Sequence, residues 1–399
     1  MQYPLAKLGG TEYIEKRVFM SKIVVKYGGS SLDSIEKMQR IAKQIKSYRE
    51  RYDQVYVVTS AMGKTTNELI KLASSLAENP NLSELDRLVS TGEIVSSTLL
   101  ALILNGIGCP AKSFSGAEAG IITNDNFTNA YIMDFNPRAV VKCAKTGKVC
   151  VLAGFQGVTR AGQITTLGRG GSDTTAVMLA GKLKCECIIN TDVNGVMAFS
   201  PLDSAPRRLL TSINYDDMIS LANAGARVMD SRATELGKKY DVAITVKSSF
   251  GRTDGTNISS FGMERMGMYA MTYQPEMILV KSRAPLGRLF RLCTEYKIKI
   301  QPFNVGESCT FLTKQANLSL LKSLDLVTSR KLGLATITIV GGGVFNHIME
   351  LGTIIEKLKG KNIKLIDCYT SANTITLIVH NSQLNEAYKY LTRIIKWNK

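Results

Sequence analysis

The sequence predicts an α/β fold in which a mostly parallel sheet is covered by helices on both faces. Apolar, β-branched segments of strand length alternate with helical segments through residues 20–260, which is typical of parallel strands buried on both sides. Loops rich in glycine or hydroxyl residues follow several of these segments, and such sheets bind ligands at the carboxyl ends of their strands. After residue 260 the pattern changes to short alternating strands separated by amphipathic helices. The chain is therefore expected to have two architectural parts.

The first part begins with apolar strands that lead into polar loops. Strands are expected at 21–27, 53–59, 111–114, 148–155, 186–191 and 242–248. Helices are expected at 33–51, 67–77, 83–104, 137–145, 174–183, 215–224 and 229–240. Ser83 is the expected N-cap of its helix. The polar residues 115–135 are interpreted as an irregular rim loop.

The second part consists of two passes of β-α-β-β-α-β order, which is a split βαβ pattern. A polar, glycine-rich break at 251–262 separates it from the first part. The predicted division is an extension at 1–19, a main domain at 20–260 and a paired domain at 261–399. Within the last, the first pass covers about 275–334. The second covers about 335–399 with an additional strand near 267–273.

Composition excludes several classes of protein. The 399 residues carry a net charge of +17, but the basic residues are dispersed, so nucleic-acid binding is not expected. No uninterrupted apolar run approaches the ~20 residues that cross a bilayer, and no signal peptide is expected. The eight scattered cysteines favour reduced thiols in the cytoplasm. Only His347 and His380 are present, so catalysis by a Ser-His-Asp or Cys-His set is excluded before residue 347.

The segment 166–175, Thr-Leu-Gly-Arg-Gly-Gly-Ser-Asp-Thr-Thr, has the features of an anion-binding loop. Its three glycines allow backbone N–H groups to close on an anion, and Arg169 can grip a carboxylate or phosphate with two hydrogen bonds. Ser172 or Asp173 is expected to cap the helix that follows. Taken alone, the segment could equally be an ordinary glycine-rich turn before a capped helix.

Other candidate residues follow strands at the same predicted edge. Lys26 precedes Gly28, Gly29 and Ser30, and it could neutralise phosphate and offset the charge of Asp173, or could simply extend into solvent. The remaining candidates are hydroxyl or charged residues, and each could instead be a turn, cap or solvated surface residue: Ser60, Thr66, Glu93, Thr191, Asp192 and Arg227. A P-loop is excluded because Val58 occupies the position of its first glycine. Gly92, in the middle of a helix, indicates a close approach to another segment.

Taken together, these motifs resemble those of the aspartate kinases in the amino acid kinase family. The resemblance rests on VVKYGGSSL at 24–32, VVTSAMGKTTNEL at 57–69, LVSTGE at 88–93, TTLGRGGSDTTAV at 165–177, TDVNGV at 191–196 and the Gly-Ala-Arg-Val context at 225–228. It implies an amino acid kinase fold followed by two ferredoxin-like ACT domains. It also implies phosphorylation of the L-aspartate β-carboxylate by ATP with Mg²⁺ to give 4-phospho-L-aspartate, the first step towards lysine, threonine and methionine.

By matched position, the resemblance also implies residue roles. Catalysis would involve Lys26, Asp173 and Arg227. Aspartate would be bound by Arg169 at its α-carboxylate and Glu93 at its ammonium, with Ser60, Thr66 and Ser172. The nucleotide would be bound by Lys26, Gly28, Gly29, Ser30, Thr191, Asp192 and Met197. No metal site made of protein ligands is implied. Lysine or threonine, or both, would act as effectors on a homodimer or higher homo-oligomer.

Chemistry supports this interpretation independently, because an aspartate carboxylate is already ionised at neutral pH and needs no general base. The sequence departs from the family pattern at Met197, Ser200 and Leu202, where an aromatic residue and Asp-Pro-Arg are usual. It departs again at Asp217, where a glutamate is usual, and at Asn373. The alternatives are a weakened or non-catalytic paralogue that senses an amino acid, or a kinase for another carboxylate such as glutamate.

Overall fold

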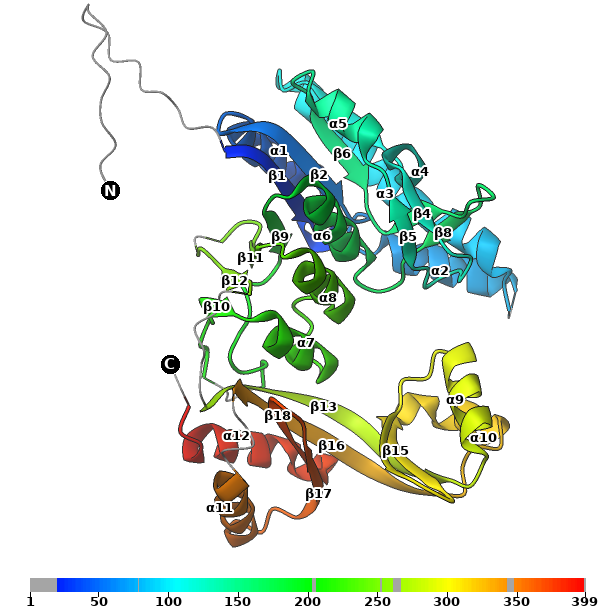
Figure 1. Ribbon diagram of the computed structural model, residues 1–399, viewed down its shortest axis with the longest axis vertical. Helices are drawn as coiled ribbons and strands as arrows, with labels where there is room; N and C mark the ends of the chain where they lie inside the picture. Colours follow the sequence, from blue (N-terminus) through cyan, green and yellow to red (C-terminus); the bar gives the residue numbers. More distant parts are fainter. Residues whose placement is uncertain are drawn as a thin grey trace, which may run out of the picture.

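The computed structural model describes residues 20–77, 79–202, 206–251, 253–260, 267–342 and 348–397 (Figure 1). The predicted extension at 1–19 and His347 lie outside the described residues. A large and a small sheet form the first part of the chain, and one further sheet forms the second.

The large sheet has eight strands in the order β10-β12-β11-β9-β1-β2-β6-β3. Every neighbouring pair is parallel except β11 with β12, so the predicted mostly parallel sheet is confirmed. Strand β1 lies between β9 and β2. After β1 the chain first forms its neighbour on one side, β2, and only much later forms its neighbour on the other side, β9. Such a switch in strand order opens a ligand-binding crevice. The strands are β1 (Met20–Tyr27), β2 (Tyr52–Thr59), β3 (Ala111–Phe114), β6 (Val149–Ala153), β9 (Cys187–Thr191), β10 (Ser212–Ile213), β11 (Ile244–Ser248) and β12 (Thr256–Ile258).

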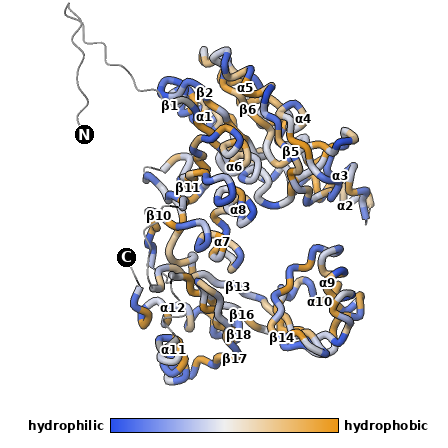
Figure 2. The backbone as a smooth tube through the Cα atoms, viewed as in Figure 1, coloured by the Kyte–Doolittle hydropathy of each residue, from blue (hydrophilic) through white to orange (hydrophobic). Residues whose placement is uncertain are grey.

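Helices cover both faces of this sheet. Successive residues of its strands point to opposite faces, and apolar side chains occur on both. Ile23 and Val25 of β1 pack with α1 and α3 in one core, whereas Val24 packs with α5 and α6 in another. Hydrophobic residues are frequent along α3 and its neighbouring strands (Figure 2). The helices of this part are α1 (Ile35–Arg49), α2 (Thr65–Leu76), α3 (Leu82–Gly106), α4 (Gly116–Ala119), α5 (Arg138–Ala144), α6 (Gly171–Leu183), α7 (Tyr215–Asn223) and α8 (Ser231–Tyr240).

The small sheet corrects the prediction that residues 115–135 are irregular. This segment contains α4 and two of the four strands in the order β5-β4-β7-β8. Main-chain pairing and burial of alternate residues stabilise these short strands in spite of their polar sequence. Strand β8 leads directly into the glycine-rich loop. The strands are β4 (Ile121–Thr123), β5 (Ile132–Phe135), β7 (Gln156–Val158) and β8 (Ile164–Thr166).

Two predicted helix caps are also wrong. The N-cap of α3 is Asn81, whose Oδ1 accepts the N–H groups of Ser83 and Glu84 at 3.0 and 3.2 Å. Helix α6 has no side-chain cap, because Gly170 enters it in the left-handed conformation with φ of 68° and has no side chain to offer. Ser172 and Asp173 instead lie in its first turn.

Helix α3 is long and apolar enough to cross a membrane by length and composition, with a mean hydropathy of 1.5 over its most apolar window. Half of that window is buried inside the protein. The helix also buries Asp86 and Glu93, which fits a core helix of this fold rather than a membrane span.

The second part forms a six-stranded sheet in the order β14-β15-β13-β16-β18-β17. The additional strand expected near 267–273 continues into the first pass as one long strand, β13, which pairs with the long strand β16. Helix α10 (Leu318–Ser323) is short, because Asp325 adopts φ of 54° soon after it. The elements are β13 (Gly267–Ser282), α9 (Leu286–Glu295), β14 (Gln301–Val305), β15 (Cys309–Lys314), α10 (Leu318–Ser323), β16 (Ser329–Gly342), α11 (Ile348–Gly360), β17 (Leu365–Thr370), β18 (Thr374–His380) and α12 (Leu384–Ile394).

This sheet is attached to α7 through two of the residues that depart from the family pattern. Asn373 Nδ2 donates to Asp217 Oδ1 at 2.7 Å, and Ser220 Oγ donates to Asn373 Oδ1 at 3.0 Å. Tyr269 of β13 donates its hydroxyl to the other carboxylate oxygen of Asp217. The two departures therefore meet in a single contact between the parts of the chain.

Candidate active site

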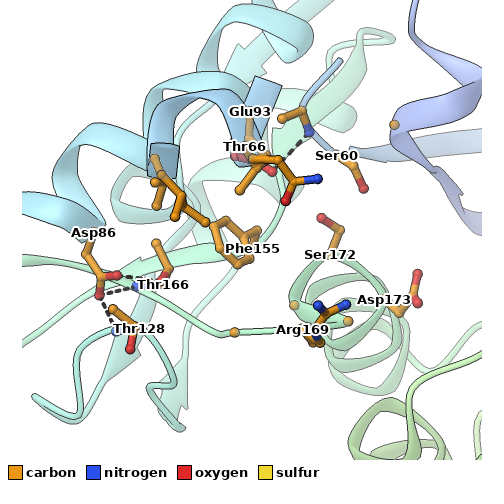
Figure 3. A pocket seen from close by; sticks show the side chains of 18 of the residues that line it. Ser60, Thr66, Asp86, Glu93, Thr128, Phe155, Thr166, Arg169, Ser172 and Asp173 are labelled. Carbon is orange, nitrogen blue, oxygen red and sulfur yellow. Dashed lines mark hydrogen bonds between the residues drawn. The ribbon is translucent and has the colours of Figure 1, made fainter. Parts of the chain in front are cut away.

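A cavity of about 560 Å³ lies at the carboxyl ends of β1 and β2 and against the glycine-rich loop before α6 (Figure 3). It brings together residues that the sequence analysis took from four separate motifs. Those that line it are Lys26, Gly29, Ser60, Thr66, Glu93, Arg169, Ser172 and Asp173. Residues far apart in the chain converge here because parallel strands end at one edge of the sheet.

Lys26 and Asp173 form an ion pair in the wall of the cavity. Lys26 Nζ lies 2.6 Å from Asp173 Oδ1, and their side chains are 10% and 13% exposed. Lys26 is held at the end of the central strand β1, and Asp173 lies in the first turn of α6. The pair fixes the ammonium group of Lys26 beside the backbone of Gly28, whose N–H donates to Asn190 O at 3.2 Å.

The loop before α6 depends on glycine at two left-handed positions, Gly168 and Gly170, with φ of 76° and 68°. A Cβ on Gly170 would lie 2.2 Å from the Cβ of Asp230, so no other residue fits this backbone without displacement. Arg169 stands between the two glycines, exposed, and forms no ion pair with any of the described residues. Its guanidinium group is therefore available to an anion in the cavity.

Glu93 is buried in the wall that α3 contributes. Its Oε1 accepts the backbone N–H of Ala61 at 3.0 Å, and its Oε2 has no partner among the described residues. Burial raises the pKa of Glu93 to about 7, because nothing within reach compensates its charge fully. A cation in the cavity would meet an unsatisfied carboxylate oxygen.

The predicted close approach at Gly92 explains how Glu93 reaches this position. A Cβ on Gly92 would lie 2.8 Å from the Cβ of Ala61. The glycine therefore lets α3 pack directly against the loop after β2, and the next residue is brought within hydrogen-bond distance of that loop.

Three cavity residues escaped the sequence analysis: Asp86, Thr128 and Phe155. Asp86 is fully buried at one side of the cavity, where its carboxylate accepts hydrogen bonds from Thr128 and Thr166 (Figure 3). Asp86 precedes Glu93 by two helical turns and shares its face, which is the signal that could have indicated it. Phe155, which was expected to end a strand, adopts φ of 69° and projects into the cavity. A non-glycine residue in this conformation is uncommon and often belongs to a functional site.

The remaining predicted residues do not line this cavity. Gly28 lies beside Lys26, and Thr191 and Asp192 end and follow β9, the neighbour of β1. Met197 pairs with Leu209 in an isolated bridge. Arg227 is exposed between α7 and α8, where its charge lies close enough to affect Lys314. Among the described residues, no cluster of three or more His, Cys, Asp or Glu side chains could hold a metal ion.

The fold and cavity define a member of a known class of phosphotransferases. The family model described as "Amino acid kinase family" matches residues 21–248. An aspartokinase of Bacillus sp. strain MGA3 is 36% identical over 400 residues, covering 93% of this chain and 96% of that protein. The chain belongs to the aspartokinase family, as its motifs predicted.

Solved structures show the same fold. Escherichia coli aspartokinase III in complex with aspartate and ADP has a TM-score of 0.77 at 21% identity, covering 94% of this chain and 100% of that one. The same E. coli enzyme in complex with lysine and aspartate has a TM-score of 0.73 at 23% identity, covering 92% and 98%. The predicted amino acid kinase fold with a C-terminal pair of ACT passes is therefore confirmed.

Proposed function

We propose that this chain transfers the γ-phosphoryl group of ATP to the β-carboxylate of L-aspartate, giving 4-phospho-L-aspartate and ADP. Membership of the aspartokinase family supports the reaction, and the cavity supports the substrate.

One observation carries the substrate assignment: on different walls, the cavity presents a cation and a carboxylate oxygen that have no partner among the described residues. Arg169 and Glu93 are both available to a ligand (Figure 3). An α-amino acid has the complementary groups, so Arg169 binds the α-carboxylate with two hydrogen bonds and Glu93 receives the ammonium group. Ser60, Thr66 and Ser172 line the space between them. The substrate's side chain is then directed towards Lys26.

The transfer itself needs positioning and charge neutralisation. Aspartate's β-carboxylate is ionised at neutral pH and attacks the γ-phosphorus directly, while the bond to the leaving oxygen of ADP breaks in line. Lys26, oriented by Asp173, neutralises charge on the transferred group. The amides of Gly29 and Ser30 bind phosphate oxygens beside Gly28, whose own N–H is donated to Asn190 O. Mg²⁺ would accompany the nucleotide phosphates and offset their charge.

The nucleotide is expected at the carboxyl ends of β1 and β9. Thr191 and Asp192 are assigned to the nucleotide because β9 ends next to β1, beside the phosphate-binding backbone. Met197 is assigned to it by its place in the motif that begins at Thr191. Arg227 is assigned a second phosphate contact from its Gly-Ala-Arg-Val context alone.

The second part of the chain is assigned to regulation and assembly. We propose a kinase domain at 20–260 and tandem ACT passes at 261–399, with lysine or threonine, or both, as effectors of a homodimer or higher homo-oligomer. The E. coli enzyme solved with lysine supports lysine as the first effector to test. A cytoplasmic location fits the eight unpaired cysteines.

The test is to trap the acyl phosphate with hydroxylamine. The purified protein, ATP and Mg²⁺ are incubated with aspartate or with glutamate, and the hydroxamate is measured. Aspartyl hydroxamate is expected, with far less glutamyl hydroxamate. Product from glutamate alone would identify another carboxylate kinase, and no hydroxamate from either substrate would contradict a kinase.

A further inference from the structure

One lysine of the six-stranded sheet unit reaches the wall of the cavity in the kinase part. Lys297, which follows α9, donates from Nζ to Phe127 O at 3.1 Å and to the hydroxyl of Thr128. Its backbone is anchored by the next residue, since Ile298 N donates to Cys293 O at 2.7 Å and Ile298 is buried. The fold around α9 therefore fixes the backbone from which the exposed Lys297 side chain extends.

Thr128, the residue that Lys297 contacts, is held in a strained conformation. It is β-branched and adopts φ of 66°, which is a genuine outlier for such a side chain. Conformations of this kind persist only where the surroundings enforce them. Here two contacts do so, because Lys297 binds the Thr128 hydroxyl and Asp86 Oδ2 accepts the Thr128 N–H at 2.8 Å.

Asp86 connects this turn to the strand that leads into the Arg169 loop. Besides Thr128, its carboxylate accepts the N–H of Thr166 at 2.8 Å and the Thr166 hydroxyl at 2.6 Å. Asp86 is fully buried and its direct partners are all neutral. Burial raises the pKa of Asp86. The hydrogen bonds from Thr166 and Thr128 act in the opposite direction, and the positive charge of Lys297 adds a smaller effect of the same sign. Lys297 therefore supports both the geometry and the ionised state of Asp86.

The turn at 128–130 also lies directly against the Arg169 loop. Ala130 N donates to Thr166 O at 2.8 Å, and a Cβ on Gly168 would lie 2.7 Å from Asn129 Oδ1. Arg232 donates to Leu167 O at 3.0 Å and to Ala130 O at 2.7 Å, so it clamps the two segments together. A displacement of the turn must therefore move the loop that carries Arg169.

We propose that Lys297, Thr128 and Asp86 form a positioning relay through which the six-stranded sheet unit sets the Arg169 loop and hence the affinity for the substrate's α-carboxylate. The inference rests on the proposed function, because it takes Arg169 as the carboxylate-binding group. While Lys297 contacts Thr128, the Arg169 loop is held in position for binding. An effector that moves α9 away from the turn at 128–130 breaks this contact, releases the strained Thr128 and weakens aspartate binding. None of the three residues touches the reacting atoms.

The experiment compares Lys297→Met, which keeps the aliphatic length but removes the ammonium, with Lys322→Met, an exposed lysine of α10 in the same sheet unit. KM values for aspartate and ATP and kcat are measured for each full-length variant. Lys297→Met is expected to raise the KM for aspartate about 3- to 10-fold, with kcat and the KM for ATP within twofold of wild type. Lys322→Met is expected to match wild type. A contact that only joined the two parts would not give this selective effect.

Variants of Thr128 keep the proposal testable if Lys297→Met folds poorly. Thr128→Ser retains the hydroxyl and is expected to keep the wild-type KM for aspartate. Thr128→Val lacks the hydroxyl and is expected to raise the KM for aspartate as Lys297→Met does. The double variant with Lys297→Met and Thr128→Val is expected to have a KM for aspartate no higher than that of either single variant, because both substitutions remove the same contact.

Two results would overturn the relay: a Lys297→Met variant with an aspartate KM within twofold of wild type, or equal increases in both KM values. Failure of the proposed function is distinguished by the wild-type protein. If wild type forms no aspartyl hydroxamate, the function is wrong. If it does and the variants are unaffected, only the relay is wrong.

Discussion

Replacing Glu93 with glutamine is expected to weaken aspartate binding and to stabilise the free protein at alkaline pH. The Glu93 side chain is only 3% exposed, and its Oε2 has no partner among the described residues. Burial raises the pKa from 4.5 to about 7. At pH values above 7 that difference corresponds to about 3 kcal/mol of destabilisation from keeping the buried side chain ionised.

The sign of the pH effect follows from the proton count. Between pH 4.5 and 7 the folded protein binds a proton at Glu93 that the unfolded chain has already lost, so stability falls as pH rises through this window. Glutamine carries no such cost and can still accept the Ala61 N–H. The free energy of unfolding of Glu93→Gln is therefore expected to exceed that of wild type by roughly 2–3 kcal/mol at pH 8.5, and by less than about 1 kcal/mol at pH 5.

Catalysis should change in the opposite direction, because glutamine cannot form an ion pair with the substrate's ammonium group. A hydrogen bond to a charged group contributes roughly 1.5–3 kcal/mol, so the KM for aspartate is expected to rise roughly 10- to 100-fold. The KM for ATP should change less than twofold. In wild type, kcat/KM for aspartate should fall as pH drops below about 7, where Glu93 becomes protonated in the free enzyme. The variant should lack this limb of the pH profile.

Urea unfolding at the two pH values and steady-state kinetics from pH 6 to 8.5 measure both effects. Glu84→Gln, an exposed glutamate in the first turn of the same helix, is the matched control. An aspartate KM for Glu93→Gln that equals the control's, or a variant that is less stable than wild type at pH 8.5, would refute the reasoning.

Three further substitutions test the cavity. Arg169→Ala is expected to raise the KM for aspartate far more than that for ATP, and equal effects on both in steady-state kinetics would contradict its assigned role. Lys26→Met is expected to lower kcat by about 10²- to 10³-fold, with hydroxamate formation as the readout; an unchanged kcat would exclude Lys26 from the transfer step. Gly170→Ala, whose Cβ would lie 2.2 Å from the Asp230 Cβ, is expected to lower the free energy of unfolding by about 2 kcal/mol or more. Gly287→Ala, in a helix where a Cβ meets nothing within 4 Å, should be neutral or stabilising, and equal urea midpoints for the two glycine variants would contradict the packing argument.

The main sheet could be predicted because its strands are apolar on both faces. Ile23, Val24 and Val25 of β1 are all fully buried, although they point to different sides. Burial of this kind leaves a continuous hydrophobic signal in the sequence. The small sheet left no such signal, since β4 and β7 are three residues long and mix polar with apolar side chains. Their stability comes from partners distant in sequence.

The same contrast holds within the cavity. Lys26, Arg169 and Glu93 could be proposed because glycine-rich or helix-interrupting motifs surround them. Asp86 could not, because its partners Thr128 and Thr166 lie 42 and 80 residues away along the chain. In sequence, Asp86 is one more charged residue on a helix, and only the fold shows that it is buried and bound on both oxygens.

The central claim is that opposed charges, Arg169 and Glu93, select an α-amino acid. The most direct test measures kcat/KM for phosphorylation of aspartate, of succinate, which lacks the ammonium group, and of 3-aminopropanoate, which lacks the α-carboxylate. We predict that Glu93→Gln loses at least 10-fold of the preference for aspartate over succinate, whereas Arg169→Ala loses the preference over 3-aminopropanoate. Preferences that remain at the wild-type values in both variants would contradict the account.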